Sequence, residues 1–320
     1  MVLTDLKEPK LRKDALLMTG ASFVLSRIMV GNFLFTIPLM VLHTRFTNKR
    51  EALAPVGVLA LLILATELYK ARGALGSVEG KLLFLISLFI PTVLLVASAV
   101  WIALEGHPTS HRYLASSLFG VVASVVMVIW FSHPSPALLR VDELFYETFA
   151  NLFGQGSTSG FSEAAMKNLY RVAVMSTGAM LAPMCMVLVG FSSFMALSWT
   201  KREAGDFATT VSRWKVSEQL LWPFLGAWTV VLLLMVTKAS YLPRALSLQV
   251  ALSIAVLYAV QGVAIIVHFL LKRGKVVRIS KLVTYLFLLA FVVPGLNVLV
   301  IFALPLLGVT ESWFTYRRYE

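Results

Sequence analysis

Long apolar runs alternate with short polar stretches along the whole chain, and this alternation predicts a bundle of membrane-spanning helices. A helical span needs roughly 20 mostly apolar residues, because each residue advances a helix by only about 1.5 Å. The runs cover residues 15–42, 53–68, 82–104, 113–132, 169–200, 220–237, 247–271 and 282–307. We therefore predict an all-α, polytopic fold with eight or nine transmembrane segments, forming one integral membrane domain over residues 1–320.

The first apolar run is broken by polar residues and helix breakers, namely Arg27, Gly31, Asn32 and Pro38. We predict one helix to about Ser26, a short irregular turn, and a second short helix from about Phe35. Such broken spans pack against protein rather than lipid, because unpaired backbone groups are costly in hydrocarbon. In the last run, Pro294–Gly295 would split the segment into a hairpin that returns the C-terminus to the side of the N-terminus.

Three polar stretches lie outside these runs: residues 1–14, 133–168 and 201–219. In the second stretch the apolar residues Leu138, Val141, Phe145, Phe149 and Leu152 recur every three or four positions. This periodicity predicts an amphipathic helix that lies on the membrane surface or covers one end of the bundle. We interpret residues 201–219 as a short cytoplasmic loop in which Trp214 anchors at the membrane interface.

The composition strengthens the membrane interpretation. Hydrophobic residues make up 58% of the chain and charged residues only 14%, against about 25% in soluble domains. The net charge is +12, but the basic residues gather between the apolar runs, and no soluble stretch interleaves them with aromatic residues. We therefore expect this charge to face the lipid bilayer and not nucleic acid.

The distribution of lysine and arginine predicts the orientation of the chain. With the first run counted as two crossings, 17 basic residues fall on the side of the N-terminus and 10 on the other side. With the first run as a single crossing, the two sides hold nearly equal numbers. Basic loops face the cytoplasm, so the N-terminal segment 1–14 and the loop 272–281 are predicted to be cytoplasmic.

Arg27 and Asn32 are candidate ligand-binding residues because they lie within the first apolar run. A charge inside a membrane is costly and marks a functional candidate by default. At the turn between two half-helices, Arg27 and Asn32 would share a polar pocket for an anionic ligand. Alternatively, the Arg27 side chain snorkels to a lipid headgroup. We interpret Glu67 as an interfacial carboxylate paired with Lys70, one turn further along the helix.

A late apolar run, YAVQGVAIIVHFLLKR at residues 258–273, also carries polar side chains. Gln261 and His268 are seven residues apart, nearly two helical turns, so they share one face with Tyr258. Gly262 beside this face lets another backbone approach closely. Gln261 is expected to form a hydrogen bond across that contact or, alternatively, to contact a ligand. His268 is expected to lie near the headgroups.

Signatures of catalysis are missing from the sequence. It contains neither a His-Glu-x-x-His zinc motif nor a Gly-x-Ser-x-Gly nucleophile motif. His107 and His111 are four residues apart, but Pro108 disfavours a helix there and no cysteine or carboxylate cluster completes a metal site. The single cysteine, Cys185, lies within an apolar run. We expect neither an enzyme nor a bound metal or cofactor.

Three motifs stand in the C-terminal third: RWKVSEQLLW at 213–222, LYAVQGVAIIVHFLLKR at 257–273 and LLGVTESWFTYRRYE at 306–320. They resemble motifs of the YybS-like family of predicted bacterial membrane proteins, a domain of unknown function. The matching residues are Trp214, Tyr258, Gln261, Gly262, Leu307, Gly308, Trp313, Tyr316 and Arg317. Ser217, Glu311 and Thr315 depart from the family pattern, which has proline at the first position and aspartate at the other two.

The resemblance implies a location in the bacterial inner membrane. The family is similar in layout to the substrate-binding subunits of energy-coupling-factor vitamin transporters. It therefore implies a non-enzymatic, transporter-like protein that binds a small molecule between its helices, through Arg27, Asn32 and Gln261. The alternative is a membrane scaffold or assembly factor whose basic cytoplasmic loops hold a membrane or cytoplasmic protein partner. A co-purifying metabolite would favour the first function, and a stable co-purifying protein the second.

Overall fold

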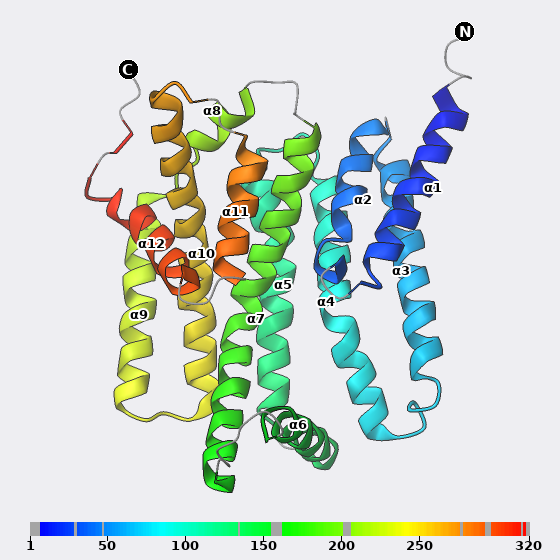
Figure 1. Cartoon of the computed structure of the whole chain (residues 1–320), viewed down its shortest axis with the longest axis vertical. Helices are drawn as coiled ribbons and strands as arrows, with labels where there is room; N and C mark the ends of the chain where they lie inside the picture. The colour runs from blue at the N-terminus through cyan, green and yellow to red at the C-terminus, as the bar shows by residue number, and fades with distance from the viewer. Residues whose placement is uncertain are drawn as a thin grey trace.

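The computed structural model describes residues 7–28, 31–46, 48–133, 135–154, 162–200, 206–275, 278–291, 296–314 and 316–317. All the regular elements in these ranges are helices, and they form a bundle (Figure 1). Six of these helices are long and apolar enough to cross a membrane. The predicted all-α, membrane-type fold is thereby confirmed, whereas the count of eight or nine segments stays a prediction.

The long helices run alternately down and up through the bundle. In Figure 1, α3 (Lys49–Ala71), α5 (Thr109–Phe131) and α9 (Leu221–Val236) run downward, with η3 (Glu218–Leu220) extending the last of them at its start. The helices α4 (Val78–Ala103), α7 (Glu163–Thr200) and α10 (Tyr241–Lys272) run upward. We refer to the end at which α4 and α7 finish as the upper end of the bundle, and to the opposite end as the lower end.

Side-chain caps fix where α3 and α4 begin. The side chain of Asn48 accepts a hydrogen bond of 3.1 Å from the N–H of Arg50, and Ser77 Oγ accepts one of 3.0 Å from the N–H of Gly80. These bonds satisfy backbone donors that the first turn of a helix leaves unpaired, and each is worth about 1 kcal/mol. Both helices therefore begin four residues before the apolar runs that predicted them.

The first apolar run contains two helices that turn back on each other. The helix α1 (Lys7–Leu25) is followed by η1 (Gly31–Phe33), α2 (Thr36–Leu42) and η2 (His43–Arg45). A Cβ atom on Gly31 would lie 2.4 Å from the carbonyl oxygen of Leu25, so only glycine fits at this turn. Every residue of α2 except Val41 is buried, because other helices surround it. That this run crosses the bilayer twice stays a prediction.

The last apolar run also contains two helices, α11 (Ile279–Phe291) and α12 (Leu296–Thr310). Both lie in the upper part of the bundle, where α11 runs downward and α12 runs back up beside α10 (Figure 1). Each is shorter than the roughly 20 residues that a span needs. The expected break at Pro294–Gly295 lies outside the described residues.

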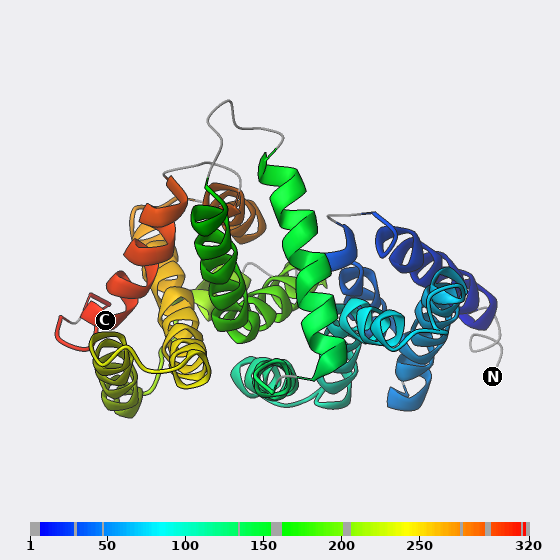
Figure 2. The same ribbon diagram turned by 90° about the horizontal axis from the view of Figure 1, so that it is seen from below.

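The stretch predicted to form an amphipathic helix contains α6 (Pro136–Gly154), which lies across the lower end of the bundle (Figures 1 and 2). Its first half packs inward: Leu138 and Val141 are buried, and Arg140 forms an ion pair of 3.2 Å with Glu79 of α4. Its second half is open, with Leu152 72% exposed. The apolar residues of α6 therefore pack against the bundle in the first half of the helix and are exposed in the second half.

The stretch predicted to be a plain cytoplasmic loop, 201–219, contains a short helix, α8 (Asp206–Ser212), at the upper end (Figure 1). The sequence analysis missed α8 because seven residues carry too few apolar positions to show a helical period. The principal core lies among α2, α3, α4 and α7. Its fully buried members include Phe35, Leu39, Leu59, Leu94, Trp101, Ile102 and Val189.

Candidate functional site

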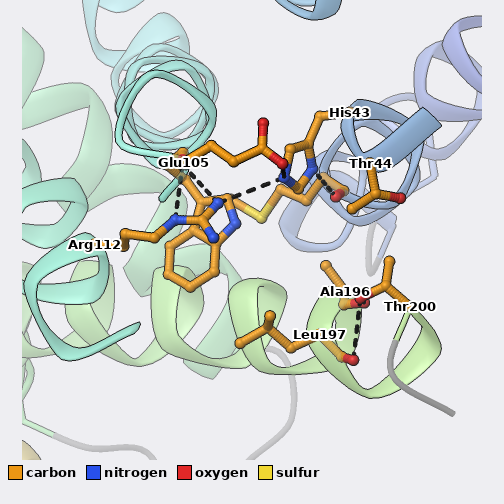
Figure 3. A pocket seen from close by; sticks show the side chains of 9 residues that line it. His43, Thr44, Glu105, Arg112, Ala196, Leu197 and Thr200 are labelled. Atoms are coloured by element: carbon orange, nitrogen blue, oxygen red, sulfur yellow. Dashed lines mark hydrogen bonds and ion pairs between the residues drawn. The ribbon is translucent and has the colours of Figure 1, made fainter. Parts of the chain in front are cut away.

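A pocket of about 170 Å³ opens at the upper end, among the ends of α2, α4 and α7 and the start of α5 (Figure 3). Its lining residues are Met40, His43, Thr44, Trp101, Glu105, Arg112, Ala196, Leu197 and Thr200. The set combines an apolar wall with a guanidinium, an imidazole, a carboxylate and two hydroxyls. This mixture of an apolar lining and a few convergent polar groups is typical of small-molecule sites.

His43 enters the pocket because α2 tightens into the 3-10 turn η2 at this residue. Its side chain is only 4% exposed, and its Nδ1 atom is hydrogen-bonded to the carbonyl oxygen of Met40. Burial lowers the pKa of the imidazole from its ordinary value, so the ring is neutral at neutral pH. Nδ1 therefore carries the proton, and Nε2 is left as an acceptor.

Arg112 holds the centre of the site from the first turn of α5. Its guanidinium lies 4.1 Å from the ring centroid of Trp101, and its Nε and Nη2 atoms donate to the Trp101 carbonyl oxygen over 3.1 and 2.7 Å. Nη2 also lies 3.5 Å from Nε2 of His43. The Trp101 carbonyl belongs to the last turn of α4, whose carbonyls lack helical partners. Arg112 therefore also stabilises the end of α4.

The only carboxylate in the lining, Glu105, lies at the rim of the pocket. Its side chain is 42% exposed, and its Oε1 atom lies 3.9 Å from Nε2 of His43. Because the buried imidazole is neutral, this contact is not an ion pair at neutral pH. No hydrogen bond joins Glu105 to Arg112 within the described part of the chain, and none is made there by Nη1 of Arg112. A buried cation thus keeps an unused pair of N–H donors at the pocket.

Arg27, which was predicted to bind a ligand, is bonded within the chain. Its Nη1 atom lies 2.6 Å from Oε1 of Glu67, its Nη2 atom contacts Oγ1 of Thr66, and its guanidinium lies over the ring of Phe23. Glu67 also forms the expected pair with Lys70, at 3.2 Å. The anionic complement that the sequence analysis assigned to a ligand is therefore supplied by α3.

Asn32 lies in η1, at the turn between α1 and α2, and is partly buried. Figures 1 and 2 place the α1–α2 pair on the opposite side of the bundle from α10, which carries Gln261. The structure thus keeps Arg27 and Asn32 on the same turn of the chain and separates both from Gln261. The three predicted ligand-binding residues do not form a single site.

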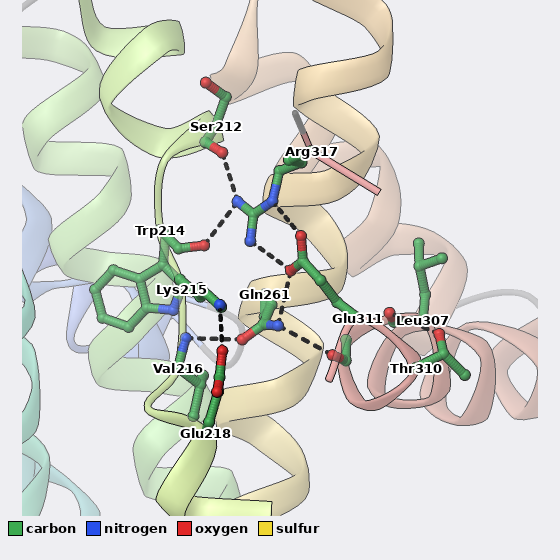
Figure 4. Close-up of polar contacts among 11 residues, drawn as sticks. Ser212, Trp214, Lys215, Val216, Glu218, Gln261, Leu307, Thr310, Glu311 and Arg317 are labelled. Atoms are coloured by element: carbon green, nitrogen blue, oxygen red, sulfur yellow. Dashed lines mark hydrogen bonds and ion pairs between the residues drawn. The ribbon is translucent and has the colours of Figure 1, made fainter. Parts of the chain in front are cut away.

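Gln261 is the centre of a buried polar network at the upper end (Figure 4). Its Oε1 atom accepts from the N–H of Val216 over 2.7 Å, and its Nε2 atom donates to the Gly308 carbonyl over 3.0 Å and to Glu311 over 2.8 Å. The carboxylate of Glu311 also accepts from two nitrogens of Arg317, over 2.6 and 2.5 Å. Gln261 therefore joins α10 to α12 and to the segment before α9.

Arg317 fills the remaining positions of this network. Its Nη1 atom donates to the carbonyl oxygens of Ser212 and Trp214, so the guanidinium is bonded on both sides although it is only 7% exposed. A buried cation requires such pairing. Trp214 contributes its carbonyl here, while its ring packs edge-on against Tyr113 with centroids 6.3 Å apart. Trp214 therefore packs within the bundle, and its expected position at the membrane interface stays a prediction.

The remaining motif residues differ in their surroundings. Tyr258 is 1% exposed and lies against Phe224, and Gly262 and Gly308 lie where α10 and α12 touch. Trp313 is 59% exposed, and Thr315 lies outside the described residues. Most of the residues that carry the family resemblance thus meet at one buried junction, which is distinct from the pocket around Arg112.

Sequence analysis did not identify the pocket. Its polar lining comes from three separate parts of the chain, around His43, Glu105 and Arg112, and Arg112 entered the sequence analysis only as one of the 17 basic residues on the side of the N-terminus. One signal was available. Arg112 directly precedes an apolar run, so it belongs to the first turn of that helix and can be buried by the helices packed beside it. Among the described residues, no group of three or more His, Cys, Asp or Glu side chains could hold a metal ion.

Comparisons with known proteins add no relative to this picture. No family model, no curated protein and no solved structure matches the chain. The resemblance to the YybS-like family therefore stays a prediction, and the candidate site rests on its own geometry.

Proposed function

We propose that this chain is a non-enzymatic, transporter-like membrane protein that binds a small molecule in the pocket at its upper end. One observation carries the proposal: Arg112 is a buried cation at a pocket with apolar walls, and its Nη1 atom has no hydrogen-bond partner among the described residues. Nη1 of Arg112 is not among the buried atoms that lack a partner, so an acceptor in the pocket can reach it. A ligand that accepts hydrogen bonds there would add to the contacts that Arg112 already makes, which makes the pocket a site for binding.

The proposed ligand binds at Arg112 and not at Arg27, Asn32 or Gln261, the residues that the sequence predicted. The guanidinium of Arg27 is neutralised by Glu67, and the amide of Gln261 is bonded on both its oxygen and its nitrogen. Of these two groups only Nε of Arg27 lacks a partner within the described residues, and that atom is covered by the protein, so neither group offers a donor to a ligand. By the same reasoning, Gln261 joins helices, which is the structural role that the sequence analysis considered beside ligand contact.

Transport and a location in the bacterial inner membrane are parts of the proposal that rest on the sequence. The charge distribution predicts that the upper end faces the cytoplasm, because α1 starts there and α10 ends there (Figure 1). A ligand in the pocket would then be exchanged with the cytoplasm. Thr44 lines the pocket and is exposed, so a larger side chain at this position would block the entrance.

Native mass spectrometry of the protein purified from its membrane tests the proposal. Wild type should carry a bound small molecule, and Thr44→Trp should lose it because the indole blocks the entrance. Thr148→Trp is the matched control, since Thr148 is also exposed and also hydrogen-bonds a backbone carbonyl one turn before it, but lies on α6 at the lower end. A protein partner that co-purifies equally with all three forms, and with no small molecule, would favour the scaffold function instead.

A further inference from the structure

We infer that the occupant of the pocket is a small organic anion whose carboxylate or phosphate-type oxygens are held by Nη1 of Arg112. The inference rests on the proposed function and specifies its ligand class. It follows from the donors that the pocket offers, the charges around it, and its size.

Arg112 supplies the hydrogen-bond donors that the pocket leaves unused. A guanidinium has five N–H groups, and the Nε and Nη2 atoms of Arg112 are directed to Trp101 and His43. The hydroxyls of Thr44 and Thr200 donate to the carbonyls of Val41 and Ala196, so they present only lone pairs to a ligand. The two N–H groups of Nη1 therefore select an acceptor, and oxyanions are the strongest acceptors for a guanidinium.

The charged groups of the pocket differ in burial. Arg112 is 8% exposed, and its neighbour His43 is neutral at neutral pH. Glu105, which is partly exposed at the rim, offsets one cation, and Lys49 donates to the carbonyls of Ala103 and Glu105 at the end of α4. Lys49 is exposed and does not line the pocket, so Arg112 and the partly exposed Glu105 are the charged groups of the lining itself. A ligand with one negative charge at Nη1 would pair with the more deeply buried of the two, Arg112.

The walls of the pocket limit the size and the remaining character of the ligand. Met40, Ala196 and Leu197 form the apolar part of the lining, and the volume is about 170 Å³. Such a space accommodates an anion with a short aliphatic part.

Two sources could supply this chemistry: a soluble carboxylate from the cytoplasm, or the monoanionic headgroup of a phospholipid. The test uses the full chain in phosphatidylcholine nanodiscs, with isobutyrate as the probe and isobutyramide as its neutral isostere. Isobutyrate should raise the Tm of wild type saturably, by roughly 3 °C or more at high excess over Kd, and isobutyramide should not. A parallel set of nanodiscs contains phosphatidylglycerol, and native mass spectrometry reports whether this lipid is retained.

Variants assign the effect to the site. Arg112→Gln should weaken isobutyrate binding roughly 10- to 100-fold, whereas Arg45→Gln, an exposed arginine at the same end, should leave it unchanged. Because Arg112 also stabilises α4, Thr44→Trp serves as the second variant, which blocks the pocket and keeps every contact of Arg112. It should abolish the isobutyrate shift or, if the lipid is the occupant, the retention of phosphatidylglycerol.

The outcomes separate the inference from the proposed function. Isobutyrate binding in phosphatidylcholine indicates a soluble anion, and phosphatidylglycerol that isobutyrate displaces indicates a headgroup; either result supports the inference. Equal shifts with isobutyrate and isobutyramide, lost in Thr44→Trp, would overturn the inference and leave a small-molecule pocket. If neither probe nor lipid distinguishes wild type from Thr44→Trp, both the inference and the proposed function are wrong.

Discussion

Gly262 of α10 and Gly308 of α12 face each other's helices at one crossing. A Cβ atom on Gly262 would lie 2.2 Å from the carbonyl oxygen of Leu304, and one on Gly308 would lie 2.0 Å from the carbonyl oxygen of Tyr258. Neither helix tolerates a side chain at this point, because the clashing atoms are backbone. The approach also brings the Gly308 carbonyl within 3.0 Å of Nε2 of Gln261. Close packing and the polar network are therefore parts of the same junction.

Gly262→Ala and Gly308→Ala should each destabilise the protein. An added methyl group must push α10 and α12 apart, and overpacking of this kind costs about 1–3 kcal/mol. The Tm in detergent measures the effect. Gly226→Ala in α9 is the control, because nothing lies within 4 Å of its added Cβ, and it should be neutral or slightly stabilising. Equal Tm values for all three variants would show that the helices do not cross so closely.

Gln261→Leu should destabilise the protein by about 1–3 kcal/mol, because it leaves the part-buried N–H of Val216 without its acceptor and removes the donor to the Gly308 carbonyl and to Glu311, which keeps only Arg317. Gln219→Leu, at an exposed position of η3, should change the Tm little. Ligand retention by native mass spectrometry should be unaffected by either substitution. A Gln261→Leu protein that melts normally but loses a bound small molecule would place the binding site at this junction.

The stability of the protein should fall as the pH decreases below about 6.5. His43 is neutral in the folded protein because burial lowers its pKa, whereas in the unfolded chain it binds a proton near its ordinary value of 6.5. The unfolded state thus binds more protons as the pH falls from 6.5 toward the lower folded pKa, and the stability contribution is lost across that window. Between about pH 7 and pH 5.5, the Tm of wild type should fall further than that of His43→Asn. Parallel pH profiles would exclude a buried, neutral His43.

The N-terminus and the loop 272–281 should be cytoplasmic, as the distribution of basic residues predicts. In a Cys185→Ala background, Lys10→Cys and Lys275→Cys should react with an impermeant thiol reagent only after the inner membrane is breached. Gly76→Cys, in the exposed turn between α3 and α4 at the lower end, should react in intact cells. Labelling of Lys10→Cys or Lys275→Cys in intact cells would reverse this orientation.

The apolar runs predicted the long helices well, because burial in lipid needs length and hydrophobicity, and both can be read locally. The role of Gly262 as a point of close approach and the hydrogen bonds of Gln261 across it also follow from one stretch of sequence. The partners of Gln261 do not: Val216, Glu311 and Arg317 come from other segments. Nothing in the three separate motifs indicates that their residues contact one another in the folded protein.

The pocket was hidden from sequence analysis for the same reason. The counter-charge of Arg27 is 40 residues away in Glu67, so an apparently isolated cation looked like a ligand-binding residue. Arg112 looked like an ordinary loop base because the buried surroundings at His43 and Trp101 are created only when α2, α4 and α5 pack together. Pairing over long sequence distances therefore decides which charges are satisfied within the chain.

An experimental density map of the protein, purified from its own membrane without added ligand, tests most directly whether the upper pocket is a binding site. We predict non-protein density between the apolar wall at Leu197 and Arg112, within about 3 Å of Nη1 of Arg112. The same map of Thr44→Trp should lack this density. A pocket closed by Nη1 bonding directly to Glu105, with ligand density beside Arg27 and Asn32 instead, would contradict the account.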